Sequence, residues 1–517
     1  MSEAPKGGPV LGDLIRRNGR LHTDDTAYVC DGRRITFAAH LERAERLAHA
    51  LRSLGLRHQS RVAVMGANSY DHVTAFSACE LAGFVAVTVN YRLAAPEVEQ
   101  ILTDSTPVAM IVDPDYAPMI DEMRARLPGI RHFIVMGDGG DWALALEDLI
   151  AGGRSDEPET WTVRPEDIIH IIYTSGTTGR PKGVMRSHFA ELAMAEMMTA
   201  EVGLLSDDIV QVMMPIFHVG ARWLLLGAQL RAATLILHLR FDEAEVIRTI
   251  ERERVTLTHM APTLVQRVLD NPLVEEADCS SLRTIYYSAA PMPLRTLQRG
   301  LSLFGNVFVQ LYGMTEGAGT TLMRNQHRPD GSAREQNWLN SVGQAPYSVK
   351  VRVVDDDGRD TPMGQPGEVV TRTPTRMSGY WNNSAATAEA VREDWYHTGD
   401  IGYLDEQGFL YLVDRKKDMI ISGGENIYCR EVEQALGSHP GLAEVAVFGT
   451  PDPEWGEVVT AAVVVVPCAA PEQDDLDAHV SRLIARYKRP RRYIFLPDLP
   501  RLNTGKVDKI ALRARKD

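Results

Sequence analysis

The sequence predicts an α/β fold: a large N-terminal domain with βαβ-type sheets and a β-rich subdomain, followed by a small α+β C-terminal domain. Two observations lead to this prediction. Apolar, strand-like runs alternate with helical periodicity up to about Leu311, and short strands with tight turns replace that alternation after about Val342. With 517 residues, 44% of them apolar, the chain can form about three lobes of roughly 150 residues around a large core.

The first elements in this alternation of strands and helices are predicted to form a β-hairpin. Residues 27–30 and 34–37 are predicted strands joined by an Asp31-Gly32 turn. A helix is expected over 41–54, because apolar residues recur there at helical spacing and Gly55 stands where a C-terminal cap would. The pattern continues with strands at 61–65, 84–89 and 108–112, a helix at 71–81, and a second run of such units from 209 to 311. It indicates largely parallel sheets covered by helices.

In the last third of the chain the pattern of predicted elements changes. Predicted short strands at 349–354 and 367–370 indicate the β-rich subdomain. The charged run 414–418 marks the expected boundary between an N-terminal domain, residues 1–416, and a C-terminal domain, residues 417–517. Within the C-terminal domain we expect helices at 430–436 and 474–486, and strands at 445–448 and 458–466.

Composition and charge exclude several classes of function. The net charge of −14 argues against nucleic acid or an anionic membrane as the main partner. No apolar run approaches about 20 residues, so no membrane span is expected, and residues 1–6 lack the apolar stretch of a signal peptide. Five scattered cysteines without a CxxC pair suit the cytoplasm and argue against a disulfide framework or a zinc site.

The most informative segment is the loop 173–183, which follows an apolar run predicted to be a buried strand. It holds three glycines, four hydroxyl-bearing residues besides its tyrosine, and a lysine. Backbone N–H groups, hydroxyls and one cation are what a polyphosphate needs. The loop is not a Walker A motif, because Gly179 precedes Arg180 and Lys182 precedes Gly183. It therefore predicts a nucleotide site that is not that of a P-loop NTPase.

Six further segments of the sequence match motifs of a known protein family. With the loop, the chain resembles the adenylate-forming superfamily of acyl-CoA synthetases, peptide-synthetase adenylation domains and beetle luciferases, from about Leu11 to Lys509. The segments stand in the family's order at 215–218, 288–291, 312–316, 395–400, 414–418 and 503–506. Residues 420–427 are most similar to the acyl-CoA ligase branch.

The resemblance implies activation of a carboxylate by ATP with release of pyrophosphate. Lys506 would be the catalytic lysine at the α-phosphate, and Glu316 would bind Mg²⁺ with help from Thr174. Tyr312 would stack on adenine, while Asp400 and Arg415 would bind the ribose. The full set of implied ATP- or AMP-binding residues is Thr174, Ser175, Gly176, Thr177, Thr178, Gly179, Lys182, Ser288, Ala289, Ala290, Tyr312, Gly313, Thr315, Asp400 and Arg415.

In a second step, the resemblance implies transfer of the acyl group to CoA after rotation of a mobile C-terminal domain. Lys417 aligns with the hinge. Gly423 and Gly424 would allow close approach of pantetheine. Trp455 matches a position that contacts CoA in some relatives, and packing is the equal alternative.

The identity of the acid stays open at this stage. His218 would lie between acyl pocket and adenylate, as a third catalytic-site residue. An α-amino acid is not expected, since the 215–218 region lacks an aspartate for the ammonium group. The small residue Gly317 would admit a bulky alicyclic, aromatic or medium-chain acid, and Arg222 either lines the pocket or points outward.

Four readings of function remain. The leading one is an acid–CoA ligase that uses Mg²⁺, ATP and CoA. The same adenylation could instead load the phosphopantetheine of a carrier protein, or precede a luciferase-like oxidation. A nucleotide-binding regulatory protein without chemistry is disfavoured by the presence of both Glu316 and Lys506. The oligomeric state also stays open, with a homodimer as one option.

Overall fold

Two compact units make up the chain. The structure, a computed structural model, describes residues 7–155, 162–174, 181–290, 292–416, 418–422, 425–467, 469, 471–501 and 507–515. The first unit comprises residues 1–351 and 371–396, and the second comprises 352–370 and 397–517. The predicted boundary between residues 416 and 417 stays a prediction.

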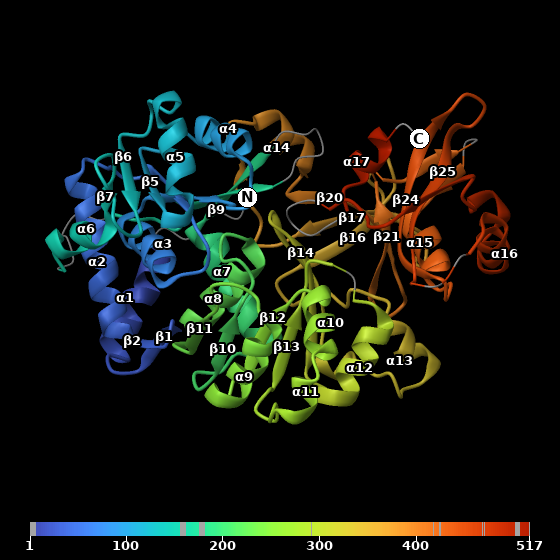
Figure 1. The fold of residues 1–517 in the computed structure, drawn as a ribbon, viewed down its shortest axis with the longest axis horizontal. Coiled ribbons are helices and arrows are strands. Elements are labelled where there is room, and N and C mark those ends of the chain that lie inside the picture. Colours follow the sequence, from blue (N-terminus) through green and yellow to red (C-terminus); the bar gives the residue numbers. More distant parts are fainter. Residues whose placement is uncertain are drawn as a thin grey trace. The chain divides into compact units, whose positions relative to one another are not determined.

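An eight-stranded sheet organises the N-terminal part of the first unit (Figure 1). Its strand order is β18-β9-β8-β4-β3-β5-β6-β7, and all neighbours from β8 to β7 are parallel, which confirms the predicted βαβ units. Its strands are β3 (Arg61–Met65), β4 (Val85–Val89), β5 (Ala109–Val112), β6 (His132–Val135), β7 (Leu144–Ala145), β8 (Ile168–Thr174), β9 (Lys182–Ser187) and β18 (Gly379–Tyr380). Strand β9 pairs antiparallel with both β8 and β18.

A second eight-stranded sheet follows the order β15-β14-β13-β12-β10-β11-β1-β2. Its interior is parallel from β14 to β1, and an antiparallel hairpin closes each end. The strands are β1 (Thr26–Cys30), β2 (Arg33–Thr36), β10 (Ile209–Val212), β11 (Thr234–Leu237), β12 (Leu257–Met260), β13 (Thr284–Tyr287), β14 (Phe308–Met314) and β15 (Gly317–Leu322). The predicted second run of units is this sheet.

Helices cover both sheets. Figure 1 shows α9, α10, α11 and α12 beside strands β12 and β13. The helices of the first unit are α1 (Leu11–Leu21), α2 (Phe37–Ser53), α3 (Tyr70–Ala82), α4 (Ala95–Ser105), α5 (Ala117–Met123), α6 (Leu146–Gly152), α7 (His188–Val202), α8 (Val219–Arg231), α9 (Glu243–Glu253), α10 (Pro262–Asp270), α11 (Leu273–Glu276), α12 (Leu294–Phe304), α13 (Ala333–Trp338) and α14 (Ser384–Ala390). The largest core cluster joins α2, α3, α7 and α8 to the strands beneath them.

Local sequence explains why the first elements form where they do. The β1–β2 turn places Asp31 at φ +50° and Gly32 at φ +73°, the left-handed pair that a two-residue hairpin requires. Helix α2 begins where the Thr36 hydroxyl accepts a hydrogen bond from the Ala39 amide at 3.2 Å, and Gly55 follows its end at φ +87°. The turn and the terminal glycine are confirmed, whereas the helix begins at Phe37, a residue predicted to end the second strand, because Thr36 caps it there.

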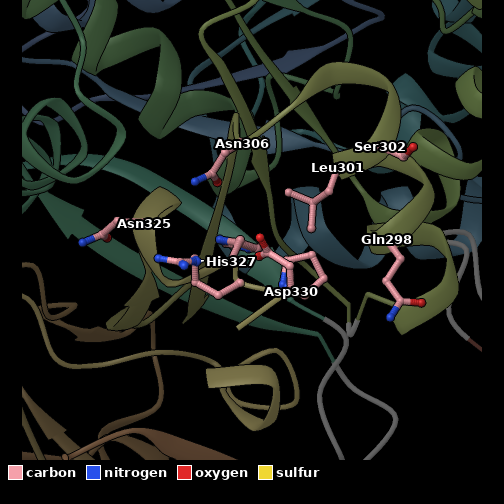
Figure 2. Close-up of a pocket in the computed structure, with 9 residues that line it drawn as sticks. Gln298, Leu301, Ser302, Asn306, Asn325, His327 and Asp330 are labelled. Atoms are coloured by element: carbon pink, nitrogen blue, oxygen red, sulfur yellow. Dashed lines mark ion pairs between the residues drawn. The ribbon is translucent and has the colours of Figure 1, made fainter. Parts of the chain in front are cut away.

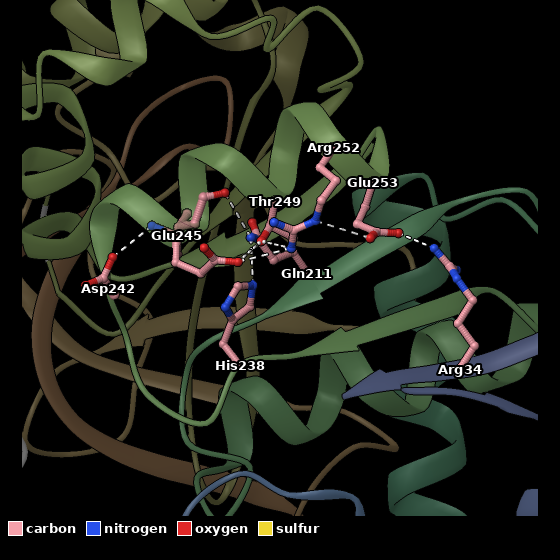
Figure 3. A network of polar contacts seen from close by, with 9 residues as sticks. Arg34, Gln211, His238, Asp242, Glu245, Thr249, Arg252 and Glu253 are labelled. Carbon is pink, nitrogen blue, oxygen red and sulfur yellow. Dashed lines mark hydrogen bonds and ion pairs between the residues drawn. The ribbon is translucent and has the colours of Figure 1, made fainter. Parts of the chain in front are cut away.

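A polar network holds α9 against the second sheet (Figure 3). The buried amide of Gln211 contacts His238 Nε2 at 2.9 Å and donates to the Val246 carbonyl at 3.1 Å. On the same helix Arg252 Nη2 donates to Glu245 Oε1 at 3.1 Å, and Glu253 pairs with Arg34 of the hairpin. Because burial lowers the pKa of His238, the network holds a neutral imidazole, and its polar groups specify the packing of the helix.

The β-rich region also forms as predicted. A five-stranded sheet has the order β16-β17-β20-β19, with β21 paired to β20. Its strands are β16 (Lys350–Val354), β17 (Gly367–Arg372), β19 (Val391–Arg392), β20 (Trp395–Leu404) and β21 (Leu410–Arg415).

The C-terminal part of the second unit is a smaller α+β assembly. Its sheet has the order β23-β22-β25-β24, with β26 parallel to β25. The elements are β22 (Ile420–Ser422), β23 (Glu425–Ile427), α15 (Cys429–Gly437), β24 (Leu442–Asp452), β25 (Gly456–Val465), α16 (Gln473–Leu483), β26 (Arg492–Leu496) and α17 (Lys509–Ala514).

One predicted helix is too long. Helix α16 ends at Leu483 rather than at residue 486, because Ile484 is extended and packs against the core of this unit. A separate 3-10 turn, Arg486–Lys488, follows. Within the described part of the chain, none of the helices is long and apolar enough to cross a membrane.

Candidate functional site

Three of the predicted site segments lie at one edge of the second sheet. Strands β10, β12, β13 and β14 are parallel neighbours. Residues 215–218 follow β10, residues 288–290 follow β13, and residues 312–316 form the end of β14 and the turn after it. The carboxyl ends of parallel strands share an edge, which is where open α/β sheets bind ligands.

Ser288 is anchored by a histidine that the sequence analysis missed. His259, in β12, places Nε2 at 2.9 Å from Ser288 Oγ and stacks on Tyr286 with ring centres 4.3 Å apart. Burial lowers the pKa of His259 to about 3, so the imidazole is neutral. A Cβ added at Gly220 would lie 3.2 Å from His259 Cε1 and 3.8 Å from Ser288 Oγ. The start of α8 therefore approaches this serine.

His218 is the residue immediately before α8, so the structure brings its backbone close to the Ser288 loop. Its ring lies 4.4 Å from that of Phe217, which packs edge-on against Tyr91. In the loop itself Ala289 is exposed and has φ +73°. A non-glycine residue rarely adopts this conformation, and such strain is concentrated at functional sites.

Glu316 is linked through Tyr380 to the described Lys182 end of the loop 173–183. Its carboxylate Oε1 accepts a hydrogen bond from the Tyr380 hydroxyl at 2.8 Å. The Nζ of Lys182 lies 5.0 Å from the centre of the Tyr380 ring, and Thr174 pairs with Lys182 across strands β8 and β9. One tyrosine thus contacts both the predicted metal ligand and a predicted phosphate-binding residue, Lys182.

Tyr380 and its neighbour Tyr396 are site residues that the sequence analysis missed. Both pack with Val184 and Met377. Burial, and then the charge of Glu316, raise the pKa of each tyrosine well above its ordinary value, so both hydroxyls keep their protons and can donate. No local pattern identifies Tyr380, because its position depends on the pairing of β18 with β9.

Two small residues after Glu316 have close neighbours. A Cβ at Gly319 would come within 2.5 Å of the Tyr312 ring, so the absence of a side chain there makes room for that tyrosine. A Cβ at Gly317 would stand in ordinary contact, 3.5 to 3.7 Å, with residues 373–376. That Gly317 lines an acyl pocket stays a prediction, as does a role of Gly313 toward the nucleotide.

Arg222 does not point outward, so that alternative is wrong. The side chain is 2% exposed, forms an ion pair with Glu80 of α3, and lies 4.6 Å from the centre of the Phe76 ring. Burial lowers the pKa of Arg222 to about 9. The pair joins α3 to α8 inside the main core, and a pocket-lining role stays a prediction.

The second unit brings together the two predicted ribose-binding residues. Asp400 in β20 is directly opposite Arg415 in β21, and Arg415 Nε lies 2.8 Å from Asp400 Oδ1. Asp400 is buried, whereas the Arg415 side chain is half exposed. In the same unit the Arg491 guanidinium stacks 4.3 Å from the centre of the Trp455 ring, a cationic and aromatic surface that suits either packing or a nucleotide ligand.

The remaining predicted residues lie outside the described part of the chain. They are Ser175, Gly176, Thr177, Thr178, Gly179, Lys417, Gly423, Gly424 and Lys506.

The described residues fit magnesium only together with a nucleotide. Within the described ranges no cluster of three or more histidine, cysteine or acidic side chains could hold a metal ion. Glu316, 9% exposed, and the Thr174 hydroxyl are the oxygen donors predicted for this ion. One carboxylate and one hydroxyl are too few for a protein cage, but they fit an ion whose other ligands are phosphate oxygens and water.

A surface cavity of about 660 Å³ lies elsewhere on the first unit, between α12 and the turn Arg324–Gln326 (Figure 2). None of the predicted site residues that the structure describes lines it. Its lining residues are Gln298, Leu301, Ser302, Asn306, Asn325, His327, Arg328, Pro329 and Asp330. The ring nitrogens of His327 are occupied, since Nδ1 contacts the Met323 carbonyl at 2.9 Å and Nε2 the Tyr287 hydroxyl at 3.0 Å.

Comparison with known proteins gives consistent matches. The family model described as AMP-binding enzyme matches residues 15–381, and that of the AMP-binding enzyme C-terminal domain matches residues 431–506. A feruloyl-CoA synthase from Amycolatopsis sp is 37% identical, covering 98% of this chain and 99% of its own. An indoleacetate–CoA ligase from Aromatoleum aromaticum is 38% identical, covering 97% of each. The solved amide bond synthetase McbA from Marinactinospora thermotolerans superposes with a TM-score of 0.87 at 29% identity, covering 97% of this chain and 99% of its own.

Proposed function

This chain belongs to the AMP-binding enzymes, and from that premise we propose that it is an ATP-dependent ligase that joins an aromatic carboxylic acid to CoA. The acid and ATP give acyl-AMP and pyrophosphate, and acyl-AMP and CoA then give acyl-CoA and AMP. The observation that carries the proposal is the contact of Glu316 with Tyr380, which also touches Lys182 at the end of the phosphate loop.

The first step brings two anions together, so the chain's task is to position them and to offset their charge. Lys182 and the loop before it would hold the β- and γ-phosphates. Tyr312 and the Ser288 loop would enclose adenine, and the Asp400–Arg415 pair would bind the ribose. When bound, Mg²⁺ would supply charge neutralisation at the phosphates, and Glu316, oriented by Tyr380, would hold it.

In the second step the thiol of CoA would attack the acyl carbon of acyl-AMP, and AMP would leave. We assign Lys417 as the hinge for this change, and Gly423, Gly424 and Trp455 to the CoA path. Arg491 joins this group, because its guanidinium stacks on Trp455 and could meet a phosphate of CoA. A cytoplasmic location and the oligomeric state stay predictions.

The proposal of an aromatic acid rests on two supports. Two relatives, at 37% and 38% identity, are named for feruloyl and indoleacetate, both aromatic acids. In this chain His218 and Phe217 place two rings at the start of α8, and Gly220 leaves space beside His259 and Ser288. Flat aromatic acids stack on such rings, and no acidic residue in 215–218 would hold an α-ammonium group.

A panel of acids tests this function directly. Ferulic, indole-3-acetic, cyclohexanecarboxylic and octanoic acids, with phenylalanine as the amino-acid control, are each given with ATP and Mg²⁺, with and without CoA. We expect pyrophosphate release and a CoA thioester, with kcat/KM at least about tenfold higher for an aromatic acid than for octanoic acid.

Other outcomes would change the proposal. Adenylate without thioester would move the acceptor to the phosphopantetheine of a carrier protein. A preference for octanoic acid would contradict the aromatic substrate class. No pyrophosphate from any acid, with ATP binding intact, would favour a nucleotide-binding regulatory protein.

Removal of the Tyr380 hydroxyl tests the core of the site. In Tyr380→Phe, Glu316 loses a hydrogen bond to a charged group, worth about 1.5–3 kcal/mol, so we expect kcat/KM for adenylation to fall at least about tenfold with little change in Tm. The matched control is Tyr403→Phe, since Tyr403 stacks on Tyr411 in the second unit. Pyrophosphate release by Tyr380→Phe at the wild-type rate would remove this tyrosine from the site.

A further inference from the structure

A fully buried arginine lies directly behind Glu316. Arg186, at the end of β9, has a side chain with 0% exposure. Its Nε donates to Glu191 Oε1 at 2.8 Å, and Glu191, in α7, is also 0% exposed. The guanidinium carbon lies 5.5 Å from the centre of the Trp223 ring. A buried charge is costly unless it is paired, and Glu191 provides the pair.

The Nη1 atom of the same guanidinium contacts two different loops. Nη1 donates to the Thr375 carbonyl at 2.6 Å and approaches the Thr315 carbonyl at 3.4 Å. Thr315 is the residue immediately before Glu316. The planar fork of arginine can contact a carboxylate on one side and two carbonyls on the other, which a lysine ammonium cannot reproduce.

Further bonds join these same two loops around Glu316. The Met377 amide donates to the Glu316 carbonyl at 2.7 Å, and the Ala318 amide donates to Thr375 Oγ1 at 3.0 Å. Tyr380 then reaches the Glu316 carboxylate. Arg186 therefore fixes the backbone from which the Glu316 side chain projects, while the residues after Thr375 fix the side chain itself.

Stability alone is a poor reason for this arrangement. Replacing a buried ion pair by apolar side chains of similar volume is often neutral or stabilising. In addition, Nη2 of Arg186 is buried without a hydrogen-bond partner among the described residues. An unpaired buried donor is itself destabilising, so the arginine is better explained by what its other nitrogens hold.

We propose that Arg186, paired with Glu191, is a positioning residue that holds the Thr315–Glu316 backbone in place for adenylation. The inference rests on the proposed function of Glu316, and it adds a determinant outside the predicted site segments. Arg186 touches neither ATP nor the acid; it acts through the loop.

The test combines kinetics with amide hydrogen exchange in the full-length protein. Arg186→Met removes charge and donors at similar length, Arg186→Lys keeps the charge, and Glu191→Gln removes the partner. We expect Arg186→Met to lower kcat for pyrophosphate release by about tenfold to a hundredfold, with KM for the acid much less affected, and Arg186→Lys to fall between it and wild type. Exchange of the Ala318 and Met377 amides should accelerate about tenfold or more.

Arg283, whose side chain is 30% exposed, offers a control with the same kinds of contact. Its Nη2 contacts the Asp208 carboxylate at 2.7 Å and its Nη1 the Gly203 carbonyl at 2.8 Å, the same kinds of contact at the amino end of β13. Arg283→Met should lower Tm without changing kcat or the exchange of those two amides.

Two results would overturn the proposal. One is a folded Arg186→Met with wild-type exchange at Ala318 and Met377; the other is an Arg283→Met that loses as much kcat as Arg186→Met does. If Arg186→Met does not fold, Arg186→Lys and Glu191→Gln carry the same readouts. The exchange measurement needs no turnover, so it tests the hold of Arg186 on the Thr315–Glu316 backbone separately from the proposed enzyme function.

Discussion

Lys506→Ala is expected to lower the rate of pyrophosphate release by about 100- to 1,000-fold while ATP still binds. The physical reason is that charge develops on the α-phosphate in the transition state, and a positioned cation stabilises it more there than in the ground state. Lys506 lies outside the described residues, so this role rests on the resemblance of residues 503–506 to the family's C-terminal motif. Single-turnover pyrophosphate release, with ATP binding measured by calorimetry, separates chemistry from affinity.

A charge-matched control belongs with this variant. Lys350→Ala removes the same charge from an exposed position at the start of β16 and should leave adenylation unchanged. The lysine also serves only the first step in our proposal. Purified acyl-AMP given with CoA should therefore still yield thioester in Lys506→Ala. Wild-type pyrophosphate release from that variant would contradict the catalytic role.

Lys417→Pro should spare adenylation and reduce thioester formation by about tenfold or more. Proline fixes φ near −65° and removes the N–H, so a backbone that must rotate at this residue loses that freedom. The second half-reaction is then limited by the conformational step rather than by chemistry. Pyrophosphate release without CoA and thioester yield from acyl-AMP with CoA measure the two halves separately.

Lys417→Ala distinguishes the backbone from the side chain. It removes the side-chain charge but leaves the backbone free to rotate at this residue, so both half-reactions should proceed. An equal loss of both halves in Lys417→Pro would count against a hinge at this residue and would point to a general disturbance of the C-terminal region.

Much of the fold could be predicted because its signals are local. The runs that became β3, β4 and β5 are apolar over strand length, and α2 carries both its Thr36 cap and its terminal Gly55. Parallel sheets follow from the repetition of such units. The predicted length of α16 was wrong, because Ile484 leaves the helix to reach the core, a contact that periodicity does not encode.

In the candidate site, too, some features could be predicted from the sequence and others appeared only in the tertiary structure. The sequence, through the family resemblance, predicted its chemistry: a phosphate loop ending in Lys182, an acid at Glu316, and a lysine at Lys506, since these residue types carry the donors and charges that the proposed reaction needs. Only the tertiary structure showed that Tyr380 contacts Glu316, that Arg186 contacts the backbone before it, and that His259 contacts Ser288.

The physical reason is that these contacts join residues far apart in the sequence. Tyr380 reaches Glu316 because β18 pairs with β9, and His259 reaches Ser288 because β12 lies beside β13. The same holds for Arg222, whose buried partner Glu80 comes from a distant helix. Strand order and helix packing decide such contacts, whereas hydrophobic periodicity specifies only which face of an element is buried.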